Sequence, residues 1–295
     1  MVKYYSPSGA FSYSSILYFS LVSITIFPLL GFIYAYCIWY IPFVYINFII
    51  TILFGFAIGY SIDKFVIGIG KVRNFWLSII FGFIGSCIAL YFHWLIWVDL
   101  VVNAGESYGT SRLGITVSNI NYSQLLFLLS NPEILFSIIS EITKTGTWSV
   151  GGSSSNSVNG TFLYIVWFIE FLIVLVVCLM TINKYRKPFC ERENCWYKEL
   201  KLKPFDYIVN VKKTVAKIEE SNLEVLETIS LQINPQRSHS IFILYTSRHN
   251  DCYLSIINKK AKRGKNEKME FNTDHVVDYV AVNKEFKDRI LGINK

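Results

Sequence analysis

The sequence has little charge for its length, and that charge is unevenly distributed. Only 17% of its 295 residues are Asp, Glu, Lys or Arg, against about a quarter in an average soluble domain. Residues 1–182 hold six basic and six acidic side chains, whereas residues 183–295 hold the other 22 basic and 15 acidic ones. This pattern excludes a single soluble globular domain. It predicts a lipid-embedded part, 1–182, followed by a soluble module, 183–295.

Several catalytic motifs are missing as well. The sequence has no phosphate-binding G-x-x-x-x-G-K, no zinc-protease H-E-x-x-H and no dinucleotide-binding glycine fingerprint. We therefore expect a protein that is not an enzyme. The net charge of +7 comes without a nucleic-acid-binding motif and with many interspersed carboxylates, so we expect the basic residues near the last span to face anionic lipid rather than nucleic acid.

Four long apolar runs dominate the first part of the chain. An α-helix needs about 20 apolar residues to cross about 30 Å of hydrocarbon, and each run is long enough. The predicted spans are residues 15–40, 43–62, 75–98 and 161–182. The fold class that follows is an α-helical polytopic membrane protein with four transmembrane helices and a small cytoplasmic α+β domain.

The Lys and Arg residues of the short loops predict the orientation. Lys64, Lys71 and Arg73 lie between spans two and three, and a second basic group follows span four, whereas the link 99–160 is rich in carboxylates. Both termini are therefore expected in the cytoplasm, and 99–160 outside. Heavy use of Ile, Asn, Lys, Phe and Tyr is typical of an AT-rich genome and favours a bacterial cell (inner) membrane.

A further apolar stretch, 122–142, competes for a fifth span. It is interrupted around Asn131 and Pro132, a natural N-cap followed by the residue best suited to the first helical turn. We therefore expect a helix stop and a new amphipathic helix over about 132–143, lying on the membrane surface or against the bundle. A fifth span would also put the basic link between spans two and three outside.

Small residues recur in spans two and three. Gly55 and Gly59 form a G-x-x-x-G pair, and Gly82 and Gly85 follow in the next span. Such residues let helix backbones approach closely. The first interpretation is packing within one chain, and the second is the seam of a homo-oligomer.

Glu170 and His93 are the only ionisable side chains well inside a span, apart from tyrosines and cysteines. A charged group at the bilayer centre is costly, so an intramembrane carboxyl is a functional candidate by default. Glu170 would be protonated and structural, would relay protons or bind a cation, or would pair with another subunit. The two residues differ in depth by about 9 Å at the helical rise, so a direct contact needs helix tilt or a water molecule.

The soluble part is predicted as α+β. Residues 211–229 have helical spacing, 240–246 and 252–257 read as a β-hairpin, and a strand and a helix follow over 278–282 and 284–291. We expect 259–268 to be a solvated basic loop.

The module also holds a candidate metal site. Cys190, Cys195, His249 and Cys252 would make a tetrahedral set suited to structural zinc, although their spacing is irregular. Free thiols without a cofactor are the favoured interpretation.

Two functional hypotheses follow. The first is a non-enzymatic membrane anchor, sensor or accessory subunit whose cytoplasmic domain binds a protein partner. The second is a small channel or a proton- or cation-linked transporter subunit that uses Glu170.

Overall fold

The computed structural model describes residues 4–41, 43–110, 113–146, 159–232, 234, 236–249, 251–263 and 269–294. The chain divides into two compact units. One is helical and comprises Gly9–Tyr185. The other is rich in β-structure and combines Arg186–Lys295 with Met1–Ser8. The two chain ends thus belong to one unit. The boundary predicted from the sequence, between residues 182 and 183, assigns them to different parts.

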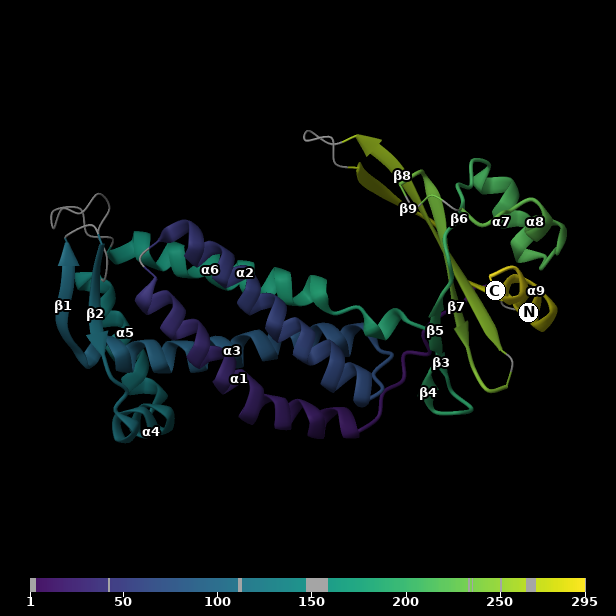
Figure 1. The fold of residues 1–295 in the computed structure, drawn as a ribbon. Coiled ribbons are helices and arrows are strands. Elements are labelled where there is room, and N and C mark those ends of the chain that lie inside the picture. The colour runs from purple at the N-terminus through teal and green to yellow at the C-terminus, as the bar shows by residue number, and fades with distance from the viewer. Residues whose placement is uncertain are drawn as a thin grey trace. The chain divides into compact units, whose positions relative to one another are not determined.

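The helical unit contains, among the described residues, four helices long and apolar enough to cross a membrane, as predicted (Figure 1). They are α1 (Ser14–Tyr40), α2 (Val44–Ser61), α3 (Phe75–Val102) and α6 (Gly160–Thr181). Figure 1 shows them running side by side.

Two of these helices extend beyond the predicted spans. α2 continues as a π-helix, Ile62–Ile69, because Asp63 is held in place: its Oδ1 accepts the backbone N–H groups of Asn183 (2.8 Å) and Lys184 (2.6 Å). α3 runs to Val102 rather than 98, because the buried Asp99 carboxyl accepts hydrogen bonds from Asn103 and Asn121 in place of water. Charged residues expected in loops are therefore part of helices.

Glycines set the closest approaches between helices. A Cβ added at Gly55 would lie 2.8 Å from the carbonyl oxygen of Val174, and one at Gly59 would lie 2.5 Å from that of Cys178, both on α6. Gly82 likewise faces the Leu179 side chain of α6, and Gly85 faces Ile62 and Phe27. A Cβ added at any of the four glycines would thus meet another helix of the same chain.

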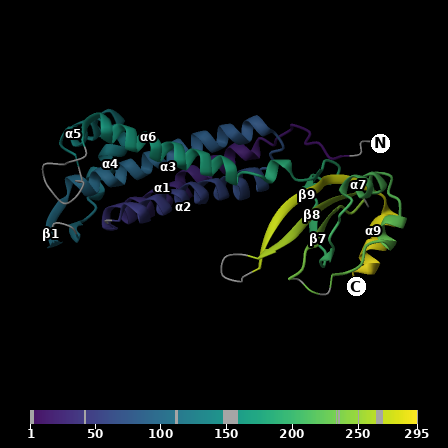
Figure 2. The same cartoon turned by 90° about the horizontal axis from the view of Figure 1, so that it is seen from above.

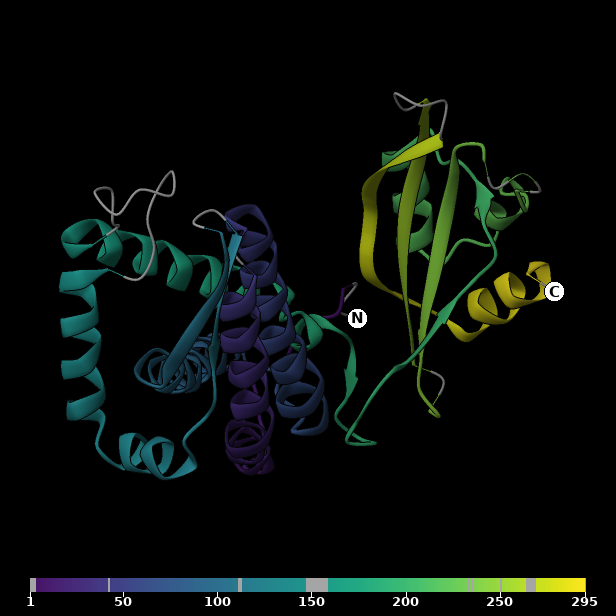
Figure 3. The ribbon, with the colours of Figure 1, turned by 60° about the vertical axis from the view of Figure 1, so that its left-hand side comes forward.

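The segment between α3 and α6 has more structure than expected. It begins with an antiparallel hairpin, β1 (Ala104–Thr110) and β2 (Leu113–Ser118), which hydropathy did not reveal. Two helices follow, α4 (Tyr122–Ser130) and α5 (Pro132–Thr145), bent by 108° at Asn131 (Figure 3). The predicted helix break is confirmed, and Leu135, Ile139 and Ile142 of α5 are buried.

The other unit is built on an antiparallel sheet with the order β5-β7-β8-β9, and β6 also pairs with β7 (Figure 2). Its strands are β5 (Lys198–Lys201), β6 (Phe205–Asp206), β7 (His239–Thr246), β8 (Cys252–Arg263) and β9 (Met269–Val282). A small hairpin precedes the sheet: β3 (Phe189–Cys190) with β4 (Cys195–Trp196). The basic loop predicted at 259–268 is wrong in its first half, because 259–263 continue β8 and pair with β9.

Three helices pack against this sheet and form an apolar core with it. They are α7 (Val211–Glu219), α8 (Glu224–Glu227) and α9 (Lys284–Ile293). Alternate strand residues such as Phe242, Leu254 and Val280 pack with Ile218 and Phe286 from the helices in one apolar cluster. This alternation is the period of two that a half-covered strand requires.

The N-terminal segment is attached to this unit at three points. The Tyr5 backbone N–H donates to the Tyr279 carbonyl (2.9 Å), the Tyr4 hydroxyl donates to Glu219 on α7, and the Ser8 hydroxyl donates to Glu191 (2.6 Å). The segment therefore adds a short bridge along the edge of β9.

Candidate functional site

Each of the four long helices contributes one side chain to a polar cluster inside the bundle. Tyr34 of α1 lies at its centre, with its hydroxyl oxygen 2.6 Å from Glu170 Oε1 of α6 and 2.8 Å from Thr51 Oγ1 of α2. His93 of α3 completes the cluster, with Nε2 3.8 Å from the same Glu170 oxygen. The structure thus brings together the two ionisable residues singled out from the sequence.

The cluster is largely shielded from the surface of the bundle. Tyr34 is 2% exposed and His93 3% exposed, while the Glu170 side chain retains 20%. The imidazole Nδ1 of His93 is buried without a hydrogen-bond partner among the described residues. A buried polar atom of this kind calls for an explanation, because most such atoms are paired.

Local sequence explains why the helices meet here. Gly31 lies one helical turn before Tyr34, and a Cβ added there would be 2.8 Å from the backbone nitrogen of His93. On α2, Phe54 stacks on the Tyr34 ring with centroids 4.2 Å apart, and the neighbouring Gly55 lets α6 approach one turn beyond Glu170. Glycines therefore let α1 approach α3, and α2 approach α6, closely enough for the side chains to touch.

The contact between His93 and Glu170 is closer than their depths predict. A separation of about 9 Å along the axes was expected from the helical rise. The two side chains nevertheless come within 3.8 Å of each other. Tyr34 lies beside both, and its ring centroid is 4.5 Å from that of His93. Tyr34 and Thr51 were missed, because tyrosine and threonine occur in many apolar spans and carry no distinctive spacing.

A second buried carboxyl lies at the end of α3. Asp99 is fully buried, and its oxygens accept the Asn121 backbone N–H (3.0 Å) and the Asn103 side-chain amide (3.3 Å). The Asn103 amide also donates to Gln124 (3.0 Å). This network fixes the start of α4 against α3, so its role is structural.

The four residues of the predicted zinc set are not assembled into a metal site. Cys190 and Cys195 are partners across the β3–β4 hairpin, and Cys252 is buried in β8 opposite Thr246. Among the described residues no three His, Cys, Asp or Glu side chains form a group that could hold a metal. Burial raises the pKa of the Cys252 thiol to about 12, so it stays protonated at neutral pH.

In place of a metal, a carboxylate connects the two turns. Glu193, in the β3–β4 turn, accepts the backbone N–H groups of Arg248 (2.8 Å) and His249 (3.2 Å) from the turn between β7 and β8. The six cysteines are free. The hydrogen bonds of Glu193 therefore account for the approach of these two turns.

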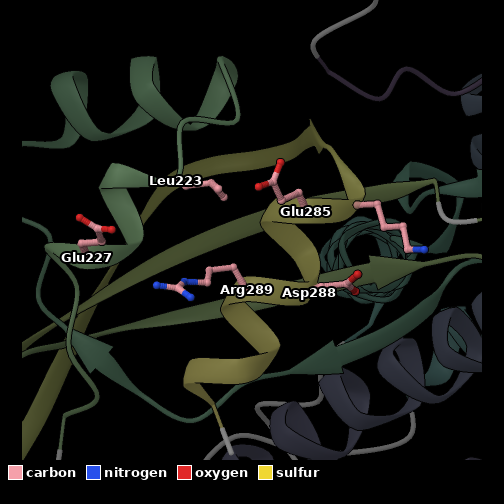
Figure 4. Close-up of a pocket in the computed structure, with 6 residues that line it drawn as sticks. Leu223, Glu227, Glu285, Asp288 and Arg289 are labelled. Atoms are coloured by element: carbon pink, nitrogen blue, oxygen red, sulfur yellow. The ribbon is translucent and has the colours of Figure 1, made fainter.

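An open groove lies between α8 and α9 (Figure 4). Its lining mixes both signs of charge, which gives no preference for an anionic or a cationic ligand. The lining residues are Leu223, Glu227, Lys284, Glu285, Asp288 and Arg289.

The link between α3 and α6 contains one motif that resembles a catalytic one. Residues 105–109 read Gly-Glu-Ser-Tyr-Gly and match the G-x-S-x-G pattern of serine hydrolases. That motif requires a sharp turn from a strand into a helix. Here the five residues lie within strand β1, which leads into β2, so the required context is not met.

Comparisons with known protein families, with curated proteins and with solved structures each found no match. Among the features described above, the polar cluster of Tyr34, Thr51, His93 and Glu170 is the one that bears most directly on function.

Proposed function

We propose that the protein is a membrane sensor or accessory subunit. Its helical bundle responds to a change at the polar cluster, and its sheet-rich domain passes the response to a protein partner. The observation that carries this proposal is the Tyr34–Glu170 hydrogen bond, because it joins the two long helices that lead directly into the sheet-rich unit.

The chain connects the helical bundle directly to the sheet-rich unit at two places. α1 follows the segment 4–8, which adds to the edge of β9, and α6 is followed within a few residues by the start of the sheet-rich unit at Arg186. The domain is thus tethered at two points. Any shift of α1 along α6 would change the distance between these tethers and strain the bridge to β9.

The same tethers support the proposed topology. The hydrogen bond from Tyr5 to Tyr279 supports a topology in which the N-terminal segment and the C-terminal domain lie on one side of the membrane. An even number of spans, four rather than five, agrees with this topology. With the basic residues at 64, 71 and 73 facing inward, both ends are cytoplasmic in a bacterial cell membrane.

Hydrogen exchange on the full chain in lipid vesicles tests the coupling. Tyr34→Phe removes the hydroxyl that joins α1 to α6 and keeps the aromatic ring. We expect the amide of Tyr5 to exchange several-fold faster in this variant, because the bridge to β9 opens more often. The matched control is Tyr40→Phe, which removes a hydroxyl from the far end of α1, where it donates to the Ser118 carbonyl.

Equal exchange of the 4–8 segment in both variants would contradict the sensor proposal. Crosslinking in cells, with the wild-type chain and Tyr34→Phe side by side, then asks whether a stoichiometric partner responds to the cluster. A partner bound equally by both variants would leave only an anchoring role.

A second candidate function is favoured by the ionisable pair itself. Glu170 and His93 inside the bundle are typical of proton- or cation-linked transport. Glu170→Gln should then abolish ion flux into vesicles that contain the purified protein. Flux equal to wild type would exclude this alternative.

A further inference from the structure

The hydrogen bonds of the polar cluster form an unbranched chain across three helices. Glu170 Oε1 contacts the Tyr34 hydroxyl at 2.6 Å, the Tyr34 hydroxyl contacts Thr51 Oγ1 at 2.8 Å, and Thr51 Oγ1 contacts the carbonyl oxygen of Asn47 at 2.9 Å. Each of these three bonds needs one proton between its two oxygens.

Counting protons decides the direction of the chain. The Asn47 carbonyl has no proton, so Thr51 must donate to it. The single hydroxyl proton of Thr51 is then used, and Tyr34 must donate to Thr51. Tyr34 has none left for Glu170, so the carboxyl group must donate to Tyr34. All three contacts are satisfied together only when Glu170 is a carboxylic acid.

An ionised Glu170 leaves the chain one proton short. Tyr34 would turn its hydroxyl to the carboxylate, and Thr51 would then donate to either Tyr34 or Asn47 but not to both. One contact at hydrogen-bond distance would join two lone pairs. In apolar surroundings an ionised carboxyl also loses its hydration, which favours the neutral acid further.

His93 is the other group that could take the proton. The titratable side chains that face Glu170 are Tyr34 from α1 and His93 from α3, whereas α2 contributes the non-titratable Thr51. The α5 groups Glu133, Glu141 and Lys144 are exposed. An imidazolium at His93 would leave its buried Nδ1–H without an acceptor among the described residues. The proton is therefore better placed on the carboxyl of Glu170.

We infer that Glu170 is a proton-binding site and that its proton holds α6, α1 and α2 in this arrangement. Release of the proton reverses the Tyr34 hydroxyl and breaks one link of the chain. One part of this inference, that the proton is the ligand sensed, rests on the proposed sensor function. The protonation of Glu170 stands on the contacts alone.

Infrared difference spectroscopy of the full chain in phosphatidylcholine vesicles tests the site. At neutral pH we expect a carbonyl stretching band of a protonated carboxylic acid, which is lost in Glu170→Gln. In Tyr34→Phe the band should shift to higher frequency, because the acid has lost its acceptor. The control is Glu133→Gln, which changes an exposed carboxyl of the same unit and should leave the band in place.

Thermal unfolding gives a second readout. Glu170→Gln keeps a neutral donor to Tyr34, so its stability should be independent of pH over the range in which the wild type loses stability as pH rises. A wild-type spectrum without an acid band assignable to Glu170 at neutral pH, or a band unchanged in Tyr34→Phe, would overturn the proposal. So would a pH response that survives in Glu170→Gln and vanishes in His93→Gln.

The two proposals fail in different ways. An acid band at Glu170, with unchanged hydrogen exchange in the 4–8 segment, keeps the proton site and removes the sensor. Altered exchange in Tyr34→Phe without an acid band keeps the sensor and removes the proton as its ligand.

Discussion

Gly59→Ala tests the packing of α2 against α6 most directly. The new Cβ would lie 2.5 Å from the carbonyl oxygen of Cys178 and 2.8 Å from the Thr181 Cβ, whereas ordinary contact begins at 3.4 Å. Both neighbours belong to or adjoin the α6 backbone, so they cannot rotate away and the helices must separate. Overpacking of this kind costs about 1–3 kcal/mol, which lowers the folding equilibrium constant by a factor of roughly 5 to 140.

The assay is unfolding of the full chain in mixed micelles, followed by tryptophan fluorescence. Trp94, Trp97 and Trp167 pack edge to face within the bundle and report on its integrity. The control is Gly292→Ala on α9, where an added Cβ meets nothing within 4 Å. Equal stability of Gly59→Ala and wild type would refute the intramolecular contact. Loss of a crosslinked dimer in Gly59→Ala, with the monomer still folded, would then favour the homo-oligomer seam.

Three more predictions concern other parts of the chain. The hydrogen bond that Tyr4 makes with Glu219 raises the pKa of Tyr4 from 10.0 to about 12. The protonated phenol therefore stabilises the fold below pH 10, and this stabilisation is lost as the pH rises toward 12. Unfolding of Tyr4→Phe should therefore lack that pH dependence. Exposed Cys195 should react with an alkylating reagent at least ten-fold faster than buried Cys252, as peptide mass spectrometry can measure. Asp99→Ala should destabilise the start of α4 by about 1–3 kcal/mol, seen as faster amide exchange there.

Each of these predictions has a contrary result. Identical high-pH unfolding of Tyr4→Phe and wild type would mean that the hydrogen bond to Glu219 is not formed in solution. Protection of both cysteines from alkylation, together with stoichiometric zinc in the purified full chain, would restore the four-ligand site. Unchanged exchange in Asp99→Ala would mean that other contacts hold the start of α4.

Hydropathy predicted the long helices well because lipid leaves the backbone few choices. A run of about 20 apolar residues must satisfy its own hydrogen bonds, and a helix does so without partners. The break at Asn131 was also predictable, since a cap and a proline act within one turn. The ends of α2 and α3 were not predictable, because Asp63 and Asp99 are satisfied by groups far away in sequence.

The β-structure shows the same limit. Strand β7 and the first half of β8 can be predicted from their apolar residues. Lys259–Arg263 have the composition of a loop, and they form a strand only because β9 lies alongside them. The bridge between Tyr4 and Val280 joins the two ends of the chain. No local pattern encodes such a pairing.

The polar cluster shows what a single residue can and cannot predict. The cost of a charge in lipid is a property of Glu170 alone, so the sequence is enough to say that this carboxyl must be neutral or paired. Which of the two applies depends on the protons that its neighbours can offer. The three contacts need three protons. Tyr34 and Thr51 each supply one and the Asn47 carbonyl supplies none, so the third proton must come from Glu170. That balance exists only once α1, α2 and α6 are in contact, and the glycines that permit the contact lie next to the polar residues rather than among them. Close packing and protonation are therefore one property of the folded bundle, and a change in either should be felt by the other.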